Sequence, residues 1–94
     1  MFDLSGQIAV VAGASSGMGR ATALALAAAG CKVVAGARRE VALQALAEEA
    51  TAAGGELLCV KTDASVKADA QALVATAVER FGRIDVLVNS VGTN

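Results

Sequence analysis

Three glycines, Gly13, Gly17 and Gly19, are the residues whose spacing most directly suggests chemistry. They follow an apolar run over residues 8–12 and precede an alanine- and leucine-rich segment, which predicts a strand, a turn and a helix N-terminus. The first amide groups of a helix lack partners within the helix, and a turn without side chains lets an anion approach them. The G-x-x-x-G-x-G spacing differs from the generic G-x-G-x-x-G, but its setting favours a diphosphate site over a glycine turn without a ligand.

Apolar runs and amphipathic segments predict the elements that must hold this turn. Strands are expected over residues 8–12, 32–37, 57–61 and 84–88, and helices after the glycine turn, over 40–53 and over 66–81. The glycines expected to end these helices are Gly30, Gly54 and Gly82. Small or apolar residues at helical spacing predict the packing face of the first helix, namely Met18, Ala21, Ala25 and Ala28. Ser65 is a candidate cap of the third helix.

The alternation of strands and helices predicts an α/β fold with one domain over residues 1–94. Strands that are apolar on both faces are typical of a parallel sheet covered by helices on each side. Right-handed crossovers then give a three-layer α/β/α, Rossmann-type βαβαβαβ unit with strand order 3-2-1-4. The winding reverses between the first and fourth strands, so the glycine turn and residues 89–92 should meet at one crevice.

Three motifs in this order resemble those of the classical short-chain dehydrogenase/reductase family, over essentially all 94 residues. Residues 12–19, AGASSGMG, are similar to the family's T-G-x-x-x-G-x-G cofactor turn, and residues 89–92, NSVG, are similar to its N-N-A-G motif. Asp63 falls where the family places an acid against the adenine. With two arginines considered below, the expected cofactor-binding residues are Gly13, Ser15, Ser16, Gly17, Met18, Gly19, Arg38, Arg39, Asp63, Ala64, Asn89, Ser90, Val91 and Gly92.

The sequence departs from the family's pattern in ways that matter for function. Ala12 replaces the usual Thr, and Ser90 and Val91 replace Asn and Ala, so the motif after the fourth strand is half matched. In the family, the catalytic Ser and the Tyr-x-x-x-Lys pair lie beyond that strand, and this chain contains no Tyr. No catalytic residue is therefore assigned, and the resemblance implies the N-terminal, cofactor-binding part of a longer enzyme.

Arg38 and Arg39 follow the second predicted strand, where a Rossmann fold meets the adenosine ribose. An acid there would favour NAD, whereas this chain has Ala37 and then two guanidinium groups that can bind a phosphate. The pattern favours NADP over NAD, the alternative being arginines that lie in solvent. Asp63 could instead be an acid that the helix dipole favours at the start of the third helix. Asn89 could equally have a structural role, with its amide group holding adjacent strand ends together.

Composition excludes several other classes of function. A formal charge of −1 without charge runs, and only Phe2 and Phe81 as aromatics, argue against a nucleic-acid surface or a polybasic membrane patch. No metal site is expected, since the chain has no His, and Cys31 and Cys59 are expected to be buried free thiols. The longest apolar stretches are too short to span a bilayer, and without a secretory signal the expected compartment is the cytoplasm.

Two functions follow from these patterns. The first is the N-terminal part of an NADP-dependent oxidoreductase, with NAD less favoured, acting on a small-molecule carbonyl or secondary alcohol. The alternative is a stand-alone, noncatalytic nucleotide-binding module. The coding sequence after Asn94 distinguishes them, because only the first requires a Tyr-x-x-x-Lys pair there. An open edge on the fourth strand would also permit a homo-oligomer.

Overall fold

The computed structural model of the protein describes residues 4–14, 17–63 and 65–89. Strands and helices alternate along them in the order β1 (Ile8–Ala12), α1 (Gly17–Ala28), β2 (Lys32–Ala37), α2 (Glu40–Ala52), β3 (Glu56–Lys61), α3 (Lys67–Phe81) and β4 (Val86–Asn89). The alternation predicted from the sequence is confirmed. The glycines expected after the helices all have a positive φ, +102° at Gly30 and +85° at both Gly54 and Gly82.

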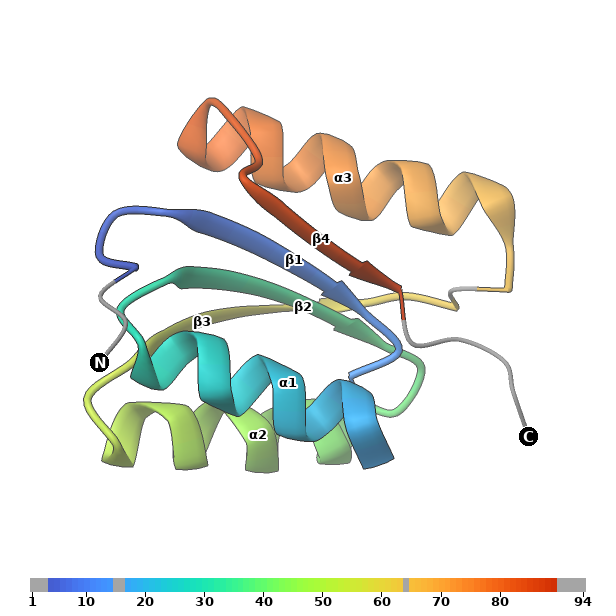
Figure 1. Ribbon diagram of the computed structural model, residues 1–94. Helices are drawn as coiled ribbons and strands as arrows, with labels where there is room; N and C mark the ends of the chain where they lie inside the picture. The colour runs from blue at the N-terminus through green and yellow to red at the C-terminus, as the bar shows by residue number, and fades with distance from the viewer. Residues whose placement is uncertain (1–3, 15–16, 64, 90–94) are drawn as a thin grey trace.

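The strands form one parallel sheet in the order β3-β2-β1-β4, as predicted. Helices α1 and α2 cover one face of the sheet and α3 covers the other, which gives three layers (Figure 1). The carboxyl ends of the strands and the N-termini of the helices lie at the same edge, on the right of Figure 1. We call this the carboxyl edge. It brings together the ends of segments that are far apart in the sequence.

The core lies on both faces of β1, in which all five residues are buried. Ala9 and Val11 pack into the cluster formed with α1 and α2, whereas Val10 packs with Leu73 and Ala77 of α3. Successive side chains of a strand point to opposite faces, so an uninterrupted apolar strand is what two helical layers require. The central strand is thereby fixed from both sides, and with it the turn that follows.

The predicted packing face of α1 is wrong. Met18, Ala21, Ala25 and Ala28 are exposed, and Met18 retains 79% of its accessible surface. The buried residues of α1 are Gly19, Ala23 and Ala27. This helix carries small or apolar residues on nearly every side, so two registers of helical spacing fit it equally well. Contact with the sheet selects the register that places Gly19 against the strands.

Two other expectations at element ends are also wrong. Ser65 does not cap α3, whose N-cap is Val66 without a side-chain cap. Strand β4 begins at Val86 rather than at residue 84, because Asp85 serves as a bridge to β1. The Asp85 Oδ2 atom accepts hydrogen bonds from the Ile8 amide at 2.8 Å and from Arg83 Nε at 3.0 Å. These contacts give Asp85 a structural role between the start of β1 and the start of β4.

The cysteines are free thiols, as expected: Cys31 is buried and Cys59 is half-buried. The Cys59 thiol donates to the Leu43 carbonyl at 3.3 Å, and burial raises the pKa of both thiols. Within the described residues, no three His, Cys, Asp or Glu side chains gather as a metal site would require. The described helices likewise include none that is both long and apolar enough to cross a membrane.

Candidate functional site

The glycine turn is tied to β2 by a shared carbonyl. The amides of Gly13 and Ala14 both donate to the Gly36 carbonyl oxygen at 3.0 Å, and Gly13 has a φ of +80°. This conformation is open to glycine and costly for other residues, which accounts for Gly13 at the first step out of β1. The chain is thereby held against β2 as it leaves the sheet. Ser15 and Ser16, expected in the same turn, lie outside the described residues.

Gly36 is a contributor that the sequence analysis missed. A Cβ on Gly36 would stand 2.8 Å from Leu73 Cδ2 and 2.8 Å from Thr62 Oγ1, so only glycine fits between these side chains. Thr62 is only 2% exposed, and its amide donates to the Ala37 carbonyl at 2.8 Å. A glycine inside an apolar strand is a known signal of such close approach. Gly36 therefore fixes both the glycine turn and the end of β3.

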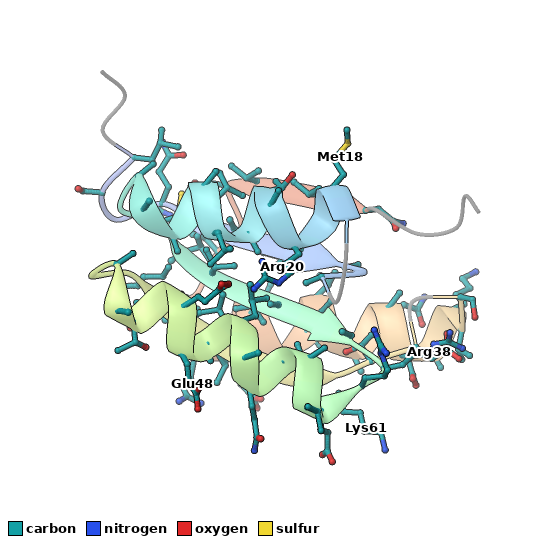
Figure 2. The ribbon with its side chains drawn as sticks, turned by 90° about the horizontal axis from the view of Figure 1, so that it is seen from below. Met18, Arg20, Arg38, Glu48 and Lys61 are labelled. Carbon is teal, nitrogen blue, oxygen red and sulfur yellow. The ribbon has the colours of Figure 1, made fainter. Side chains whose placement is uncertain are left out.

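The first turn of α1 offers an open approach to its amides. Gly17 has a φ of +60°, and among the described residues, apart from its chain neighbours and the backbone of α1 itself, no atom lies within 4 Å of the place where its Cβ would stand. Gly19 is buried against the sheet, while the Met18 side chain points away from the helix and the sheet (Figure 2). A diphosphate can reach the first amides of a helix only where no side chain fills the space in front of them, and glycine at position 17 leaves that space open.

Arg38 and Arg39 lie where β2 passes into α2, and both are exposed. Neither guanidinium group forms an ion pair with a carboxylate of the described residues, in contrast to Arg20, which pairs with Glu49 of α2. Arg39 is the N-cap of α2 and makes no side-chain cap bond. Figure 2 shows Arg38 at the end of β2, beside the segment that leads into α3. Two cations and an uncapped helix start therefore adjoin at the carboxyl edge.

Asp63 follows β3 at the same edge and is held by its neighbours. Its Oδ1 atom accepts hydrogen bonds from Ser65 Oγ at 2.6 Å and from the Ser65 amide at 3.0 Å. These two bonds, with a smaller contribution from the charge of Arg38, hold the pKa of the Asp63 carboxyl below its usual range. The Asp63 amide donates to Asp69 Oδ2 at 2.9 Å. Ala64, expected beside Asp63, is not among the described residues.

Asn89 is the last residue of β4 and pairs in register with Ala12 of β1. It therefore lies beside the start of the glycine turn, as the predicted strand order requires. The other residues of its motif, Ser90, Val91 and Gly92, fall outside the part of the chain that the structure describes. The carboxyl edge brings the glycine turn, Arg38, Asp63 and Asn89 to the ends of four adjacent strands.

The chain is similar to known proteins over nearly its whole length. The family model for short chain dehydrogenases matches residues 7–94. An uncharacterized oxidoreductase from Methylorubrum extorquens is 47% identical over 93 residues, and a 3-oxoacyl-[acyl-carrier-protein] reductase from Synechocystis is 45% identical over 93. In both cases the alignment covers 98% of this chain and 38% of the relative.

A solved structure is similar over the same region. The crystal structure of a metagenomic short-chain oxidoreductase in complex with NADP is 43% identical, with a TM-score of 0.88 over 96% of this chain and 41% of that one. The chain thus spans about two fifths of the length of such proteins. The motifs, the parallel sheet in its 3-2-1-4 order and the family match agree, and the chain belongs to the short-chain dehydrogenase family.

Proposed function

We propose that the chain is the cofactor-binding N-terminal part of an oxidoreductase that uses NADP in preference to NAD. The whole protein would reduce a small-molecule carbonyl group or oxidise a secondary alcohol. Two findings support this assignment: the name of the Synechocystis reductase, and the NADP bound in the metagenomic relative. Because the chain spans about two fifths of such proteins, the complete activity belongs to a longer polypeptide.

The residues of the carboxyl edge would divide the binding of the dinucleotide among them. The glycine turn and the first amides of α1 would hold the diphosphate, with Gly17 leaving room for its approach. Asn89, which pairs with Ala12, would support the cofactor near the start of that turn. When bound, the nicotinamide would supply a hydride to a carbonyl group or accept one from an alcohol. The expected contacts of Ser15, Ser16, Ala64, Ser90, Val91 and Gly92 remain part of this proposal.

Proton transfer requires a group that this chain does not supply. Reducing a carbonyl needs a proton donor beside the nicotinamide, and the family's motif provides a Tyr assisted by a Lys. The sequence contains no Tyr, and Asn89 cannot act as an acid of that kind. We therefore expect the 94-residue chain alone to bind cofactor without turning over a substrate.

The observation on this chain that carries the preference for NADP is the pair of guanidinium groups that follows Ala37 at the end of β2. Ala37 is buried and uncharged, so no carboxylate stands there to repel a 2′-phosphate. Arg38 and Arg39 are exposed and form no salt bridge with the described carboxylates, so both can engage a phosphate without first breaking one. The uncapped start of α2 adds a favourable dipole.

Mapping the binding site by NMR tests the assignment. On titration with NADP⁺, we expect the amide resonances of Gly13, Gly17 and Arg38 to shift, because these residues follow β1, begin α1 and follow β2 at the carboxyl edge. The amides of Gly54 and Gly82 follow the C-termini of α2 and α3 at the opposite edge and should stay in place. An absence of shifts, or shifts centred on Gly54 and Gly82, would contradict the proposed function.

A further inference from the structure

Gly36 of β2 lies between the two phosphate sites of the proposed function. Its carbonyl oxygen accepts hydrogen bonds from the amides of Gly13 and Ala14, both at 3.0 Å, and so holds the turn that follows β1. A carbonyl oxygen has two lone pairs, and the turn supplies a donor for each. Arg38, which would bind the 2′-phosphate, follows Gly36 by two positions. One short segment of β2 therefore connects the diphosphate site with the arginine site.

The same segment is held on its other side by the end of β3. The Ala37 carbonyl accepts the Thr62 amide at 2.8 Å, and Gly36 pairs in register with Val60. The Thr62 hydroxyl donates to the Val60 carbonyl at 3.0 Å, which fixes the side chain that lies against Gly36. Consecutive residues of β2 are thus bonded to the turn after β1 and to the end of β3. The backbone that carries Arg38 is thereby placed relative to the glycine turn.

Gly36 also packs closely against the layer formed by α3. A Cβ at this position would stand 2.8 Å from Leu73 Cδ2, 2.8 Å from Thr62 Oγ1 and 3.0 Å from Thr62 Cβ. Leu73 is 1% exposed and Thr62 is 2% exposed, so neither side chain can turn out into solvent. A methyl group on Gly36 would therefore push the end of β2 away from these side chains, and Arg38 would move with it.

A ligand that occupies both phosphate sites depends on the distance between them. NADP⁺ carries a diphosphate and a 2′-phosphate, whereas NAD⁺ carries the diphosphate alone. A second point of attachment strengthens binding only where the spacing of the two sites matches the ligand. A displaced Arg38 would lose charge-assisted hydrogen bonds to the 2′-phosphate, and binding at the diphosphate alone would be little affected. The position of β2 should therefore influence NADP⁺ more than NAD⁺.

We propose that Gly36 is a positioning residue that sets the distance between the glycine turn and Arg38, and thereby determines how strongly the chain prefers NADP to NAD. This inference rests on the proposed function, since it assumes that the dinucleotide binds at the carboxyl edge with its 2′-phosphate at Arg38. Gly36 is buried, and it acts through the turn and through Arg38 without touching either phosphate.

The test compares the ratio of the NADP⁺ affinity to the NAD⁺ affinity among variants of the 94-residue chain, measured by calorimetric titration. Gly36→Ala should lower this ratio by about threefold or more, because the bonds to the 2′-phosphate are weakened. Thr62→Ala leaves a gap beside Gly36 and should lower the ratio by a smaller factor. In the double variant the new methyl group fills that gap, so the ratio should return to within about twofold of the native value.

A probe for one site and a matched control complete the design. Adenosine 2′-monophosphate lacks the diphosphate, so its affinity, measured by NMR titration, should be the same in the native chain and in Gly36→Ala. Gly55→Ala is the control, because a Cβ there would stand 2.8 Å from Ala27 Cβ, before β3 at the edge opposite the carboxyl edge. It should destabilise the chain by overpacking and leave the affinity ratio unchanged.

The outcomes separate this inference from the proposed function. A purely structural role for Gly36 would weaken both dinucleotides equally, and an unchanged ratio in Gly36→Ala overturns the inference alone. A lower ratio in Gly55→Ala, or weaker binding of adenosine 2′-monophosphate to Gly36→Ala, does the same.

Two further results complete the test. If Gly36→Ala does not fold, the other two variants decide, because a ratio that Thr62→Ala leaves unchanged, or that the double variant does not return, also overturns the inference. A native chain that binds neither dinucleotide, or that prefers NAD⁺, would overturn the proposed function, and this inference with it.

Discussion

Gly17 combines a φ of +60° with open space where a Cβ would stand. We predict that Gly17→Ala lowers the free energy of unfolding by about 1–2 kcal/mol, the cost of a left-handed conformation for a residue with a Cβ. It should also weaken NADP⁺ binding by more than that strain alone explains, because the methyl group enters the approach to the α1 amides. Urea denaturation and calorimetric titration measure the two effects.

Gly54 provides the matched control for Gly17. It has a φ of +85° and follows α2 at the opposite edge of the sheet, and its Cβ position is likewise more than 4 Å from the described residues other than its chain neighbours. Gly54→Ala should cost a similar amount of stability and leave NADP⁺ affinity unchanged. Equal losses of affinity in the two variants would show that the effect at Gly17 is strain and not contact with a ligand.

Gly36 is predicted to tolerate no side chain. A methyl group there would stand 2.8 Å from side-chain atoms of both Leu73 and Thr62, one packed in the core and the other bonded to the β3 backbone. Overpacking of this kind costs about 1–3 kcal/mol, so Gly36→Ala should lower the urea midpoint. An unchanged midpoint would mean that Thr62 and Leu73 move aside freely, against the fit described for this strand.

At the scale of elements, β1 and β4 are joined at their starts by a clasp formed by Asp85, Arg83 and the segment before β1. Asp85 accepts from the Ile8 amide, its own amide donates to the Ile8 carbonyl at 2.8 Å, and Arg83 Nη2 donates to the Gly6 carbonyl at 3.2 Å. These bonds join residues that lie 77 positions apart. They align β4 with β1, and so set where Asn89 meets the glycine turn.

The contacts of Asp85 should make the free energy of unfolding depend on pH. The hydrogen bond from the Ile8 amide, together with Arg83, holds the pKa of the Asp85 carboxyl below its usual range. A depressed carboxyl pKa stabilises the fold above the unfolded-state value and ceases to do so as pH falls through the folded-state value. The difference in urea midpoint between the native chain and Asp85→Asn should therefore be present at pH 7 and shrink below about pH 4. A difference that stays constant with pH would contradict this role.

The sequence predicts the element order, the sheet order and the glycines that end the helices. Each of these depends either on local sequence patterns or on the handedness of the crossovers between parallel strands. Apolar runs mark the strands, and right-handed crossovers leave few topologies. The buried face of α1 was predicted wrongly because its alanines offer two registers, and only contact with β1 and β2 distinguishes them. The roles of Gly36, Ser65 and Asp69 depend on distances between strands and loops that no periodicity encodes.

At the scale of the whole molecule, β4 is an edge strand of the sheet. Within the described residues, β4 pairs with β1 alone, and its burial alternates along the strand. Val86 and Val88 pack against the cluster under α1 and α2, whereas Leu87, on the side of α3, remains 60% exposed. Val78 of α3 is also exposed. A strand edge beside exposed apolar side chains is a template for pairing with another chain.

We therefore predict that the 94-residue chain self-associates with increasing concentration. Leu87→Lys should reduce this association, because a charge beside an open strand edge opposes pairing. Val41→Lys is the matched control, since Val41 is 80% exposed but lies on α2, away from β4. Size-exclusion chromatography with light scattering gives the mass of each variant. A native chain that stays monomeric at all concentrations would contradict the prediction.

The central claim is that the carboxyl edge binds NADP through the arginines that follow β2. The most direct test is calorimetric titration of the native chain and of Arg38→Ala with NADP⁺ and with NAD⁺, using Arg80→Ala as a control because Arg80 lies in the last turn of α3. We predict that the native chain binds NADP⁺ more tightly and that Arg38→Ala loses about 1.5–3 kcal/mol of NADP⁺ binding with little effect on NAD⁺. Equal losses for both nucleotides, or a native preference for NAD⁺, would contradict the claim.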